Sequence, residues 1–404
     1  MAFNFSHIHD YSRFIAVDIG SYRAKSGIYD VEDSNLKEIG YATVRQNRKN
    51  FVDGEIDDIS GVMQTITQSI IHASKNLDSI PKDIITSFSS QYFIADTIST
   101  QYLRDDSESE ITMSELDTMI KKTEGASYQR AREKAKNKLG GLSADLRLVS
   151  STITRICIDD QHALQPIGLS GRKVSLGIIN IFVPASQFNI VKSLVSNLDQ
   201  RTISLIPTPL VLPKIVEQTE YALDIAFYVD IGYTYTNIII TGKNEILHLE
   251  TFPVGTSMLM ENIRDAHKKH TKKLLSLLQI ENILWDEQAI RGDIYRPVVD
   301  DFFSYIGDMI IGYLQENTQK IHFSHTFLHG NIFENPYITK CFGKHFESLL
   351  GYGVQKKRIN TLIPREYRHE EAITYGLSLI ASELLLVKKD PLVRILRYVL
   401  YHYE

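Results

Sequence analysis

Residues 14–31 read FIAVDIGSYRAKSGIYDV and predict two β-strands joined by a short polar turn. Apolar side chains dominate both runs, and Asp18 and Gly20 lie at their junction, a pattern typical of a β-hairpin. The N–H groups of such a turn can meet phosphate oxygens, and a carboxylate beside them can hold Mg²⁺ through water. The candidate phosphate-site residues are Asp18 (also a candidate metal ligand), Gly20, Ser21, Tyr22 and Lys25, whose ammonium group would lie near the phosphates.

The same pattern returns in the second half of the chain, where residues 227–242 read FYVDIGYTYTNIIITG. One Asp-x-Gly turn is weak evidence because such turns are common. Two copies in the same apolar setting favour two similar domains that clamp one nucleotide between their hairpins. The candidate residues of this second hairpin are Asp230 (again a candidate metal ligand through water), Gly232, Tyr233 and Thr234.

Length and composition limit the alternatives. A chain of 404 residues predicts two or three folded units, and 43% hydrophobic with 23% charged residues excludes a disordered or fibrous chain. A net charge of −5 disfavours a protein that coats nucleic acid, so no nucleic-acid partner is expected. Cys157 and Cys341 provide neither a disulfide framework nor a zinc-ligand spacing, which suits a reducing compartment. The N-terminus lacks a signal-peptide pattern, and no apolar run is long enough to span a membrane.

Periodicity between the hairpins predicts further elements. Apolar residues at helical spacing follow Asp57 and Asp58, either of which can cap a helix. A capping-box pattern, Thr112-x-x-Glu115, opens a second helix, whose basic part at 130–138 is expected to be a solvated face. Strands are predicted near 36–45, 84–88, 146–158, 174–182, 202–206 and 323–328, and helices at 186–198, across most of 258–319 and at 370–388.

Several of these motifs resemble a known family. DIGSYRAKSG (18–27) is similar to the first phosphate motif of the actin/Hsp70/sugar-kinase superfamily, and VDIGYTYTN (229–237) is similar to the second. Within that superfamily the chain most resembles FtsA, the bacterial actin-like cell-division protein. The supporting segments are NFVDGEIDD before the first helix, QPIGLSGRKVSL (165–176) at the end of an inserted subdomain, and IYRPVVDDFFSYI (294–306).

The resemblance implies an α/β, actin-like, two-lobed fold with two hairpin-led domains. The implied parts are a first actin-like domain at 12–87, continued by 177–213 and 365–388; an inserted FtsA-type (SHS2-like) subdomain at 88–176; a second actin-like domain at 224–257, continued by 320–364; a helical subdomain at 258–319; and a C-terminal amphipathic helix at 390–404. It also implies ATP and Mg²⁺ as ligands, with Gly255, Gly330 and Asn331 as further nucleotide-binding residues.

Three departures from the family pattern affect the nucleotide prediction. Tyr233 stands where the family's second phosphate loop has glycine, Asn237 replaces an acidic residue, and His329 replaces the first glycine of the adenosine motif. Glycine permits close approach of backbone to phosphate, so the second loop is expected to be crowded or reshaped. ATP binding is expected, with slow hydrolysis at most. The alternative is an actin-like fold that has lost its nucleotide.

The last residues, DPLVRILRYVLYHYE, predict a basic amphipathic helix that starts at Asp390. Such a helix can lie in a membrane surface, although it can also dock on its own domain. The candidate membrane residues are Leu392, Ile395, Leu396, Val399, Leu400 and Tyr403 on the apolar face, with Arg394 and Arg397 beside it.

The resemblance to FtsA therefore implies a cell-division adaptor on the cytoplasmic face of the bacterial inner membrane. It would bind ATP, polymerise with itself at the division site, contact anionic lipid and other division proteins, and tether the C-terminal tail of FtsZ. Six cations are candidates for holding that tail: Arg264, Lys268, Lys269, Lys272, Lys273 and Arg291. The alternatives are a PilM-like cytoplasmic scaffold of type IV pilus assembly and, with less support, an actin-fold kinase.

Overall fold

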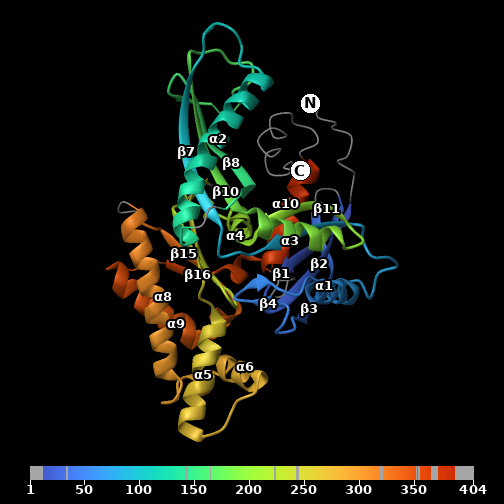
Figure 1. Ribbon diagram of the computed structural model, residues 1–404, viewed down its shortest axis with the longest axis vertical. Helices are drawn as coiled ribbons and strands as arrows, with labels where there is room; N and C mark the ends of the chain where they lie inside the picture. The colour runs from blue at the N-terminus through green and yellow to red at the C-terminus, as the bar shows by residue number, and fades with distance from the viewer. Residues whose placement is uncertain are drawn as a thin grey trace. The chain divides into compact units, whose positions relative to one another are not determined.

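A computed structural model describes residues 12–386 except 33–34, 142–143, 164, 223, 243–244, 319–321, 352, 354 and 365–371. The helix expected at 390–404 therefore lies outside the described residues. The chain forms two compact units (Figure 1). Unit 1 comprises the described residues of 1–52, 56–214 and 373–404, and unit 2 comprises those of 53–55 and 215–372.

The main sheet of unit 1 has the strand order β11-β6-β1-β2-β3. Its strands are β1 (Arg13–Ile19), β2 (Arg23–Glu32), β3 (Asn35–Arg45), β6 (Asp83–Phe88) and β11 (Arg201–Pro207). The expected hairpin is present, because β1 pairs antiparallel with β2, and β6 pairs parallel with β1. Helix α1 (Ile59–Ala73) buries Val62 and Ile66 against this sheet, and the Asp58 side chain caps it by accepting the Gly61 N–H.

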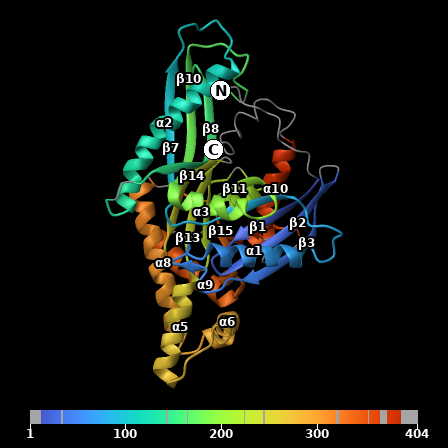
Figure 2. The same cartoon turned by 45° about the vertical axis from the view of Figure 1, so that its right-hand side comes forward.

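A second sheet of unit 1, with the order β7-β10-β8-β9, is covered on one face by helix α2 (Figure 2). Its strands are β7 (Ile94–Leu103), β8 (Leu146–Ile158), β9 (Gln161–His162) and β10 (Lys173–Pro184). Helix α2 (Met113–Lys138) begins after Thr112, whose side chain accepts the Glu115 N–H, as the capping pattern predicts. The subdomain end expected at residue 176 falls inside β10, which stays paired with β7 and β8 well beyond that residue.

The remaining elements of unit 1 connect or cover these sheets. They are β4 (Phe51–Val52), α3 (Ala185–Ser196), η1 (Thr208–Leu210), α4 (Val211–Val216, which continues into unit 2) and α10 (Ala372–Leu386). β4 pairs with β5 (Glu55–Ile56) through a turn in which Asp53 and Gly54 both have positive φ. Two positive φ angles in a two-residue turn match the twist of a tight hairpin, which explains the Asp-Gly sequence.

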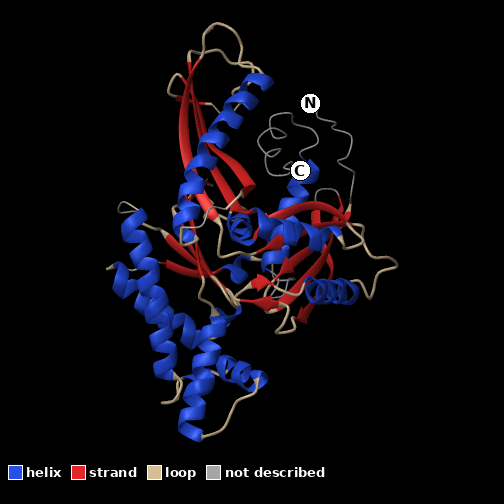
Figure 3. Ribbon diagram, in the orientation of Figure 1, coloured by secondary structure: helices blue, strands red, loops and turns tan. Residues whose placement is uncertain are grey.

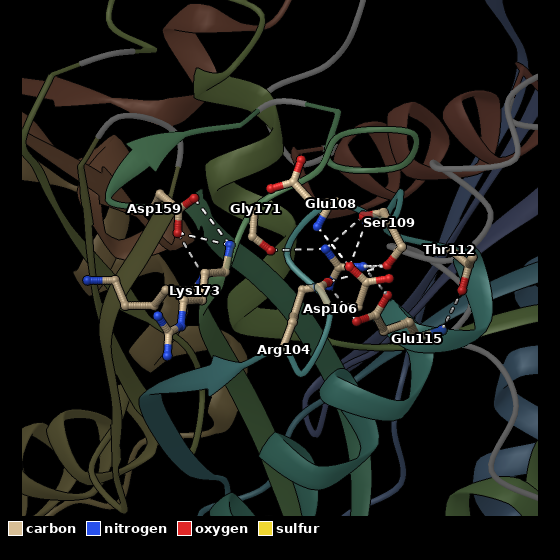
Figure 4. Close-up of polar contacts among 10 residues, drawn as sticks. Arg104, Asp106, Glu108, Ser109, Thr112, Glu115, Asp159, Gly171 and Lys173 are labelled. Atoms are coloured by element: carbon tan, nitrogen blue, oxygen red, sulfur yellow. Dashed lines mark hydrogen bonds and ion pairs between the residues drawn. The ribbon is translucent and has the colours of Figure 1, made fainter.

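A buried arginine organises one end of the α2-covered sheet (Figure 4). The side chain of Arg104 is 4% exposed and makes two hydrogen bonds to Glu115, at 2.6 and 3.1 Å. It also donates to the carbonyl oxygens of Ser109 and Gly171. The hydrogen bond with Arg104 lowers the pKa of Glu115, which stays ionised as the partner of a buried cation. This contact ties the loop before α2 to the QPIGLSG turn.

The main sheet of unit 2 has the order β14-β13-β12-β15-β16. Its strands are β12 (Ala226–Ile231), β13 (Thr236–Gly242), β14 (Glu245–Phe252), β15 (His325–His329) and β16 (Gln355–Arg358). The strand order repeats that of unit 1. Strands β12, β13 and β14 are antiparallel neighbours, and on the other side of β12 lie β15 and β16, which run parallel to it. The duplication inferred from the two hairpins is therefore present in the topology.

The rest of unit 2 is helical (Figure 3). Its helices are α5 (Thr256–Thr271), α6 (Leu277–Trp285), α7 (Glu287–Ile290), α8 (Arg296–Asn317), η2 (Asn331–Glu334), α9 (Pro336–Leu350) and η3 (Ile359–Leu362). They enclose one apolar core in which the rings of Phe227, Phe303, Phe342 and Phe346 pack together. Within the described residues, no helix is long and apolar enough to cross a membrane.

Candidate functional site

In unit 1 the hairpin places Asp18 directly opposite Lys25. The Lys25 Nζ lies 3.8 Å from the Asp18 Oδ2, and the Ser87 hydroxyl donates to Oδ1 at 3.0 Å. Ser87 reaches this position because β6 runs parallel to β1, with Ser87 in register with Asp18. Asp18 is only 8% exposed, so the pairing with Lys25 and Ser87 compensates a nearly buried carboxylate.

The turn that follows Asp18 is compact. A Cβ on Gly20 would lie 2.6 Å from the Arg23 carbonyl oxygen, so only glycine fits there without moving the backbone. The Gln46 side chain donates to the Gly20 carbonyl, and the Tyr22 ring lies close to the guanidinium of Arg45, at 5.1 Å. These contacts fix the loop that carries Ser21 and Tyr22, which are both half-buried.

In unit 2 the equivalent carboxylate is held differently. Asp230 lies opposite Asn237 in the second hairpin and in register with His329 on the parallel strand β15. Asn237 Nδ2 donates to the Asp230 Oδ2 at 2.9 Å, and His329 Nδ1 lies 2.7 Å from Oδ1. Asp230 thus occupies the position of Asp18, with an amide in place of the ammonium and an imidazole in place of the hydroxyl.

The second loop is tied to the start of α5. The N–H groups of Thr256 and Ser257 donate to the carbonyl oxygens of Gly232 and Tyr233, at 2.9 and 2.8 Å. Gly255 permits this close approach, because a Cβ there would lie 2.5 Å from the Tyr233 oxygen. First-turn N–H groups of a helix commonly bind anions, but here two of them bind the loop itself.

The two tyrosines of the second loop serve unit 2 directly. The Tyr233 ring packs on the apolar core, and Tyr235 is buried. The Tyr235 hydroxyl donates to the Asp53 carbonyl oxygen and to the Glu55 carboxylate, both residues of unit 2. The two tyrosines therefore anchor the loop within unit 2.

Gly330 brings the end of β15 against β12. Its φ is +115°, and a Cβ would lie 2.2 Å from the Ile231 carbonyl oxygen. Asn331 begins the short helix η2 immediately afterwards. The candidate residues of the second half therefore lie near the ends of β12 and β15, as those of the first half lie near the end of β1.

Sequence reasoning does not identify the partners of the two carboxylates. Ser87 is predicted only as part of a strand, and His329 and Asn237 stand out only as departures from the family pattern. The repeated hairpin is the sequence signal that could have revealed these partners. If a parallel strand lies beside each hairpin, one of its side chains must lie next to the aspartate.

The six cations expected to hold a peptide tail lie on or beside the helices of unit 2. Lys268 and Lys269 are exposed in the last turn of α5, and Lys272 ends that helix with a left-handed backbone. Arg264 pairs with Glu261 at 3.5 Å, and Arg291 pairs with Glu287 at 3.2 Å. Exposed pairs of this kind contribute little to stability.

Comparison with known proteins places this architecture. No family model and no curated protein matches the sequence. The structure is similar to a chain of the PilM–PilN type IV pilus biogenesis complex, with a TM-score of 0.61 and 14% identity over 91% of this chain and 98% of that one. The chain has the actin-like ATPase fold. A diol dehydratase-reactivating factor in nucleotide-free form gives a TM-score of 0.50 at 8% identity, covering 92% and 100% of the two chains. MreB 5 of Spiroplasma citri bound to AMPPNP gives 0.47 at 11% identity, covering 94% and 97%.

Within this actin-like fold, the two hairpins differ in how well they suit a magnesium nucleotide. In unit 1 a carboxylate and an ammonium group lie together at a fixed turn, and this donor set suits phosphate and hydrated Mg²⁺. In unit 2 both oxygens of Asp230 have close hydrogen-bond partners, at 2.9 and 2.7 Å, and the residue opposite it is an uncharged amide rather than an ammonium group. The residues of unit 1 fit the expected ligands, whereas those of unit 2 fit them in part.

Proposed function

We propose that this protein is a nucleotide-binding scaffold of the PilM kind, which binds ATP with Mg²⁺, hydrolyses it slowly and holds a partner in an assembly such as the type IV pilus machinery. The observation that carries the proposal is the likeness to the PilM–PilN chain, which extends over nearly all of both chains. In this proposal Asp18 orients the hydrated Mg²⁺, and Lys25 contacts the phosphates.

We expect hydrolysis to be slow because the carboxylate of Asp230 is already hydrogen-bonded within the protein. ATP hydrolysis requires precise placement of charged groups around the transferred phosphate. Asp230 is instead bound to Asn237 and His329, and the loop beside it binds the start of α5. Unit 2 would therefore contribute to nucleotide binding more than to catalysis.

Titration calorimetry with Mg-ATP tests nucleotide binding by the full chain. Lys25→Met is expected to weaken binding at least about tenfold, because a hydrogen bond to a charged group contributes about 1.5–3 kcal/mol. Asp117→Asn on α2, an exposed aspartate paired with Lys121, is the matched control and should bind like the wild type. No heat of binding in the wild type, or equal affinity in Lys25→Met, would refute this part of the proposal.

A coupled assay of phosphate release separates the scaffold from an enzyme. We expect turnover far below the roughly 1–100 per second usual for kinases. Multiple turnovers per second, with or without an added sugar, would support the kinase alternative instead.

A second candidate, an FtsA-like division adaptor, is favoured by one feature of the sequence. Residues 390–404 combine an apolar helical face with Arg394 and Arg397, as a membrane-surface helix requires. Such a protein would associate with the cytoplasmic face of the inner membrane and bind FtsZ. A PilM-like scaffold would instead reach the membrane through a PilN-like partner.

Flotation on anionic vesicles distinguishes the two candidates. The full chain is compared with a chain that ends at Lys389, each with and without Mg-ATP. The PilM-like proposal predicts that neither chain floats and that both bind Mg-ATP equally. Flotation of the full chain alone, strengthened by Mg-ATP, would favour the division adaptor.

A further inference from the structure

Three side chains with metal-binding chemistry meet between α8 and α9 of unit 2, and none of them belongs to either hairpin. Asp300 lies in the first turns of α8, and Cys341 and His345 lie one turn apart on α9. Their ligand atoms all lie within 4.8 Å of one another. The Cys341 thiol donates to the Asp300 Oδ1, with sulfur and oxygen 3.0 Å apart.

The spacing on α9 explains why two of these groups converge. Residues four apart on a helix project from the same face, so Cys341 and His345 present sulfur and nitrogen in one direction. Helix α8 supplies the third group across the helix–helix contact. Figure 1 shows the two helices alongside each other, and the rings of Phe303 and Phe342 pack edge to face between them.

That packing makes the group rigid. Phe303 and Phe342 are fully buried, and Gly307 of α8 lies close to the Leu349 side chain of α9. Ligands held on two packed helices are already near their bound positions, so little ordering entropy opposes metal binding.

The donor set selects the kind of metal. A thiolate, an imidazole and a carboxylate are the usual protein ligands of Zn²⁺, at about 2.3, 2.0 and 2.1 Å. Tetrahedral coordination at those lengths separates neighbouring ligand atoms by about 3.5 Å. The sulfur–oxygen distance would open slightly from 3.0 Å, and the other ligand atoms would close in from within 4.8 Å. Rotation of the side chains supplies shifts of this size.

We propose that Asp300, Cys341 and His345 bind one zinc-class divalent cation, with water as the fourth ligand. The cation takes the place of the thiol hydrogen between sulfur and carboxylate, and that hydrogen leaves as a proton. Cys341 is 8% exposed, while Asp300 and His345 are half-buried, so solvent reaches the open side of the site. The bound cation would link α8 to α9 within unit 2.

Cobalt substitution tests the site in the untagged full chain after removal of metals by chelation. Co²⁺ is expected to bind one per chain and to produce a thiolate-to-metal charge-transfer band together with the visible bands of a four-coordinate ion. Added Zn²⁺ should abolish both signals by displacing Co²⁺. Cys341→Ser should remove the charge-transfer band.

A second variant protects the test against misfolding. His345→Gln keeps the Cys341–Asp300 hydrogen bond and a good helix former, so the fold should be retained while Co²⁺ affinity falls at least tenfold. Cys157→Ser, which changes the buried cysteine of unit 1, and His270→Gln on α5 are matched controls that should bind like the wild type. A spectrum without the thiolate band, or the same titration in Cys341→Ser or His345→Gln as in the wild type, would overturn the proposal.

Discussion

Gly330 permits the close contact between β15 and β12 beside the second carboxylate. Its positive φ, and the 2.2 Å that would separate a Cβ at this position from the Ile231 oxygen, both exclude a larger residue. We expect Gly330→Ala to destabilise the protein by about 1–3 kcal/mol, because it combines backbone strain with a clash. Gly125→Ala, in α2 with no atom near its Cβ position, should instead stabilise it by about 0.5–1 kcal/mol. Urea unfolding of both variants measures the difference, and equal midpoints would contradict the expectation.

Arg104 is the second residue on which a large effect is expected. Arg104→Met leaves the Glu115 carboxylate unpaired and removes a donor from the carbonyl oxygens of Ser109 and Gly171. The expected loss is about 2–4 kcal/mol of unfolding free energy. Lys121→Met breaks an exposed i,i+4 pair with Asp117 and should change stability by less than about 0.5 kcal/mol. A loss as small for Arg104→Met as for this control would show that its hydrogen bonds contribute little.

The Arg104–Glu115 pair should make the stability of the protein depend on pH. The hydrogen bond with Arg104 lowers the pKa of Glu115 below its unfolded value of about 4.3. Ionised Glu115 therefore stabilises the fold above about pH 4, and this contribution is lost as pH falls through the lower pKa of the folded state. The stability difference between the wild type and Glu115→Gln should be constant near neutral pH and should shrink in acid. A difference that stays constant down to about pH 3 would show that the pKa of Glu115 is the same in both states.

At the scale of an element, the α2-covered sheet contains a polar layer inside its core. Asn180 on β10 is fully buried, and among the described residues neither its side-chain nitrogen nor its oxygen has a hydrogen-bond partner. Its neighbour in register, Asp96, accepts from Ser127 and Lys134. Asn180→Leu removes two unsatisfied groups at similar volume, and we expect it to be neutral or to stabilise by about 1 kcal/mol.

Ser127→Ala serves as the contrast, since it removes the hydrogen bond to Asp96 at 2.8 Å and should destabilise the protein by about 1 kcal/mol. Thermal unfolding compares the two variants. If Asn180→Leu were the more damaging change, a buried water bound to Asn180 would be the explanation, and the expectation for an unsatisfied amide would be wrong.

Elements with strong local signals could be predicted from the sequence. Helix α1 with its Asp58 cap, α2 with its Thr112 cap and the β12–β13 hairpin follow from periodicity and capping residues alone. The subdomain end predicted at residue 176 falls inside β10, where the next residue, Gly177, lies at a register shift with β8 and does not end the strand. β9 has two residues and β16 has four, so neither is long enough to show a periodic pattern, and β16 also depends on β15, which lies about thirty residues earlier in the chain.

The same limit applies to sites. Asp18 and Lys25 share one hairpin, so their pairing could be predicted from spacing. The group formed by Asp300 with Cys341 and His345 could not, because it depends on the packing of α8 against α9. Counting cysteines excludes a zinc-ligand spacing between cysteines, but it cannot detect a site that uses one cysteine with a histidine and an aspartate.

At the scale of the whole molecule, unit 2 is nearly continuous in the sequence and has its own apolar core. We expect a fragment of residues 215–372 to fold alone and unfold cooperatively. The fragment would lack Asp53 and Glu55, which accept from the Tyr235 hydroxyl. We expect this loss to lower its free energy of unfolding by about 1–2 kcal/mol. Circular dichroism during heating measures the transition. A fragment that ends at residue 318 loses β15, β16 and α9 and should show no transition, whereas the same behaviour in both fragments would contradict this expectation.

The matching registers of the two hairpins also have a historical meaning. Asp18 faces Lys25 and adjoins Ser87, while Asp230 faces Asn237 and adjoins His329, at the same positions of sheets with the same strand order. Descent of both halves from one ancestral gene segment would account for this match, and the unlike partners would then have arisen after the duplication. On that view, Asn237→Lys with His329→Ser would give Asp230 the same kinds of neighbour that Asp18 has, an ammonium group opposite it and a hydroxyl group beside it.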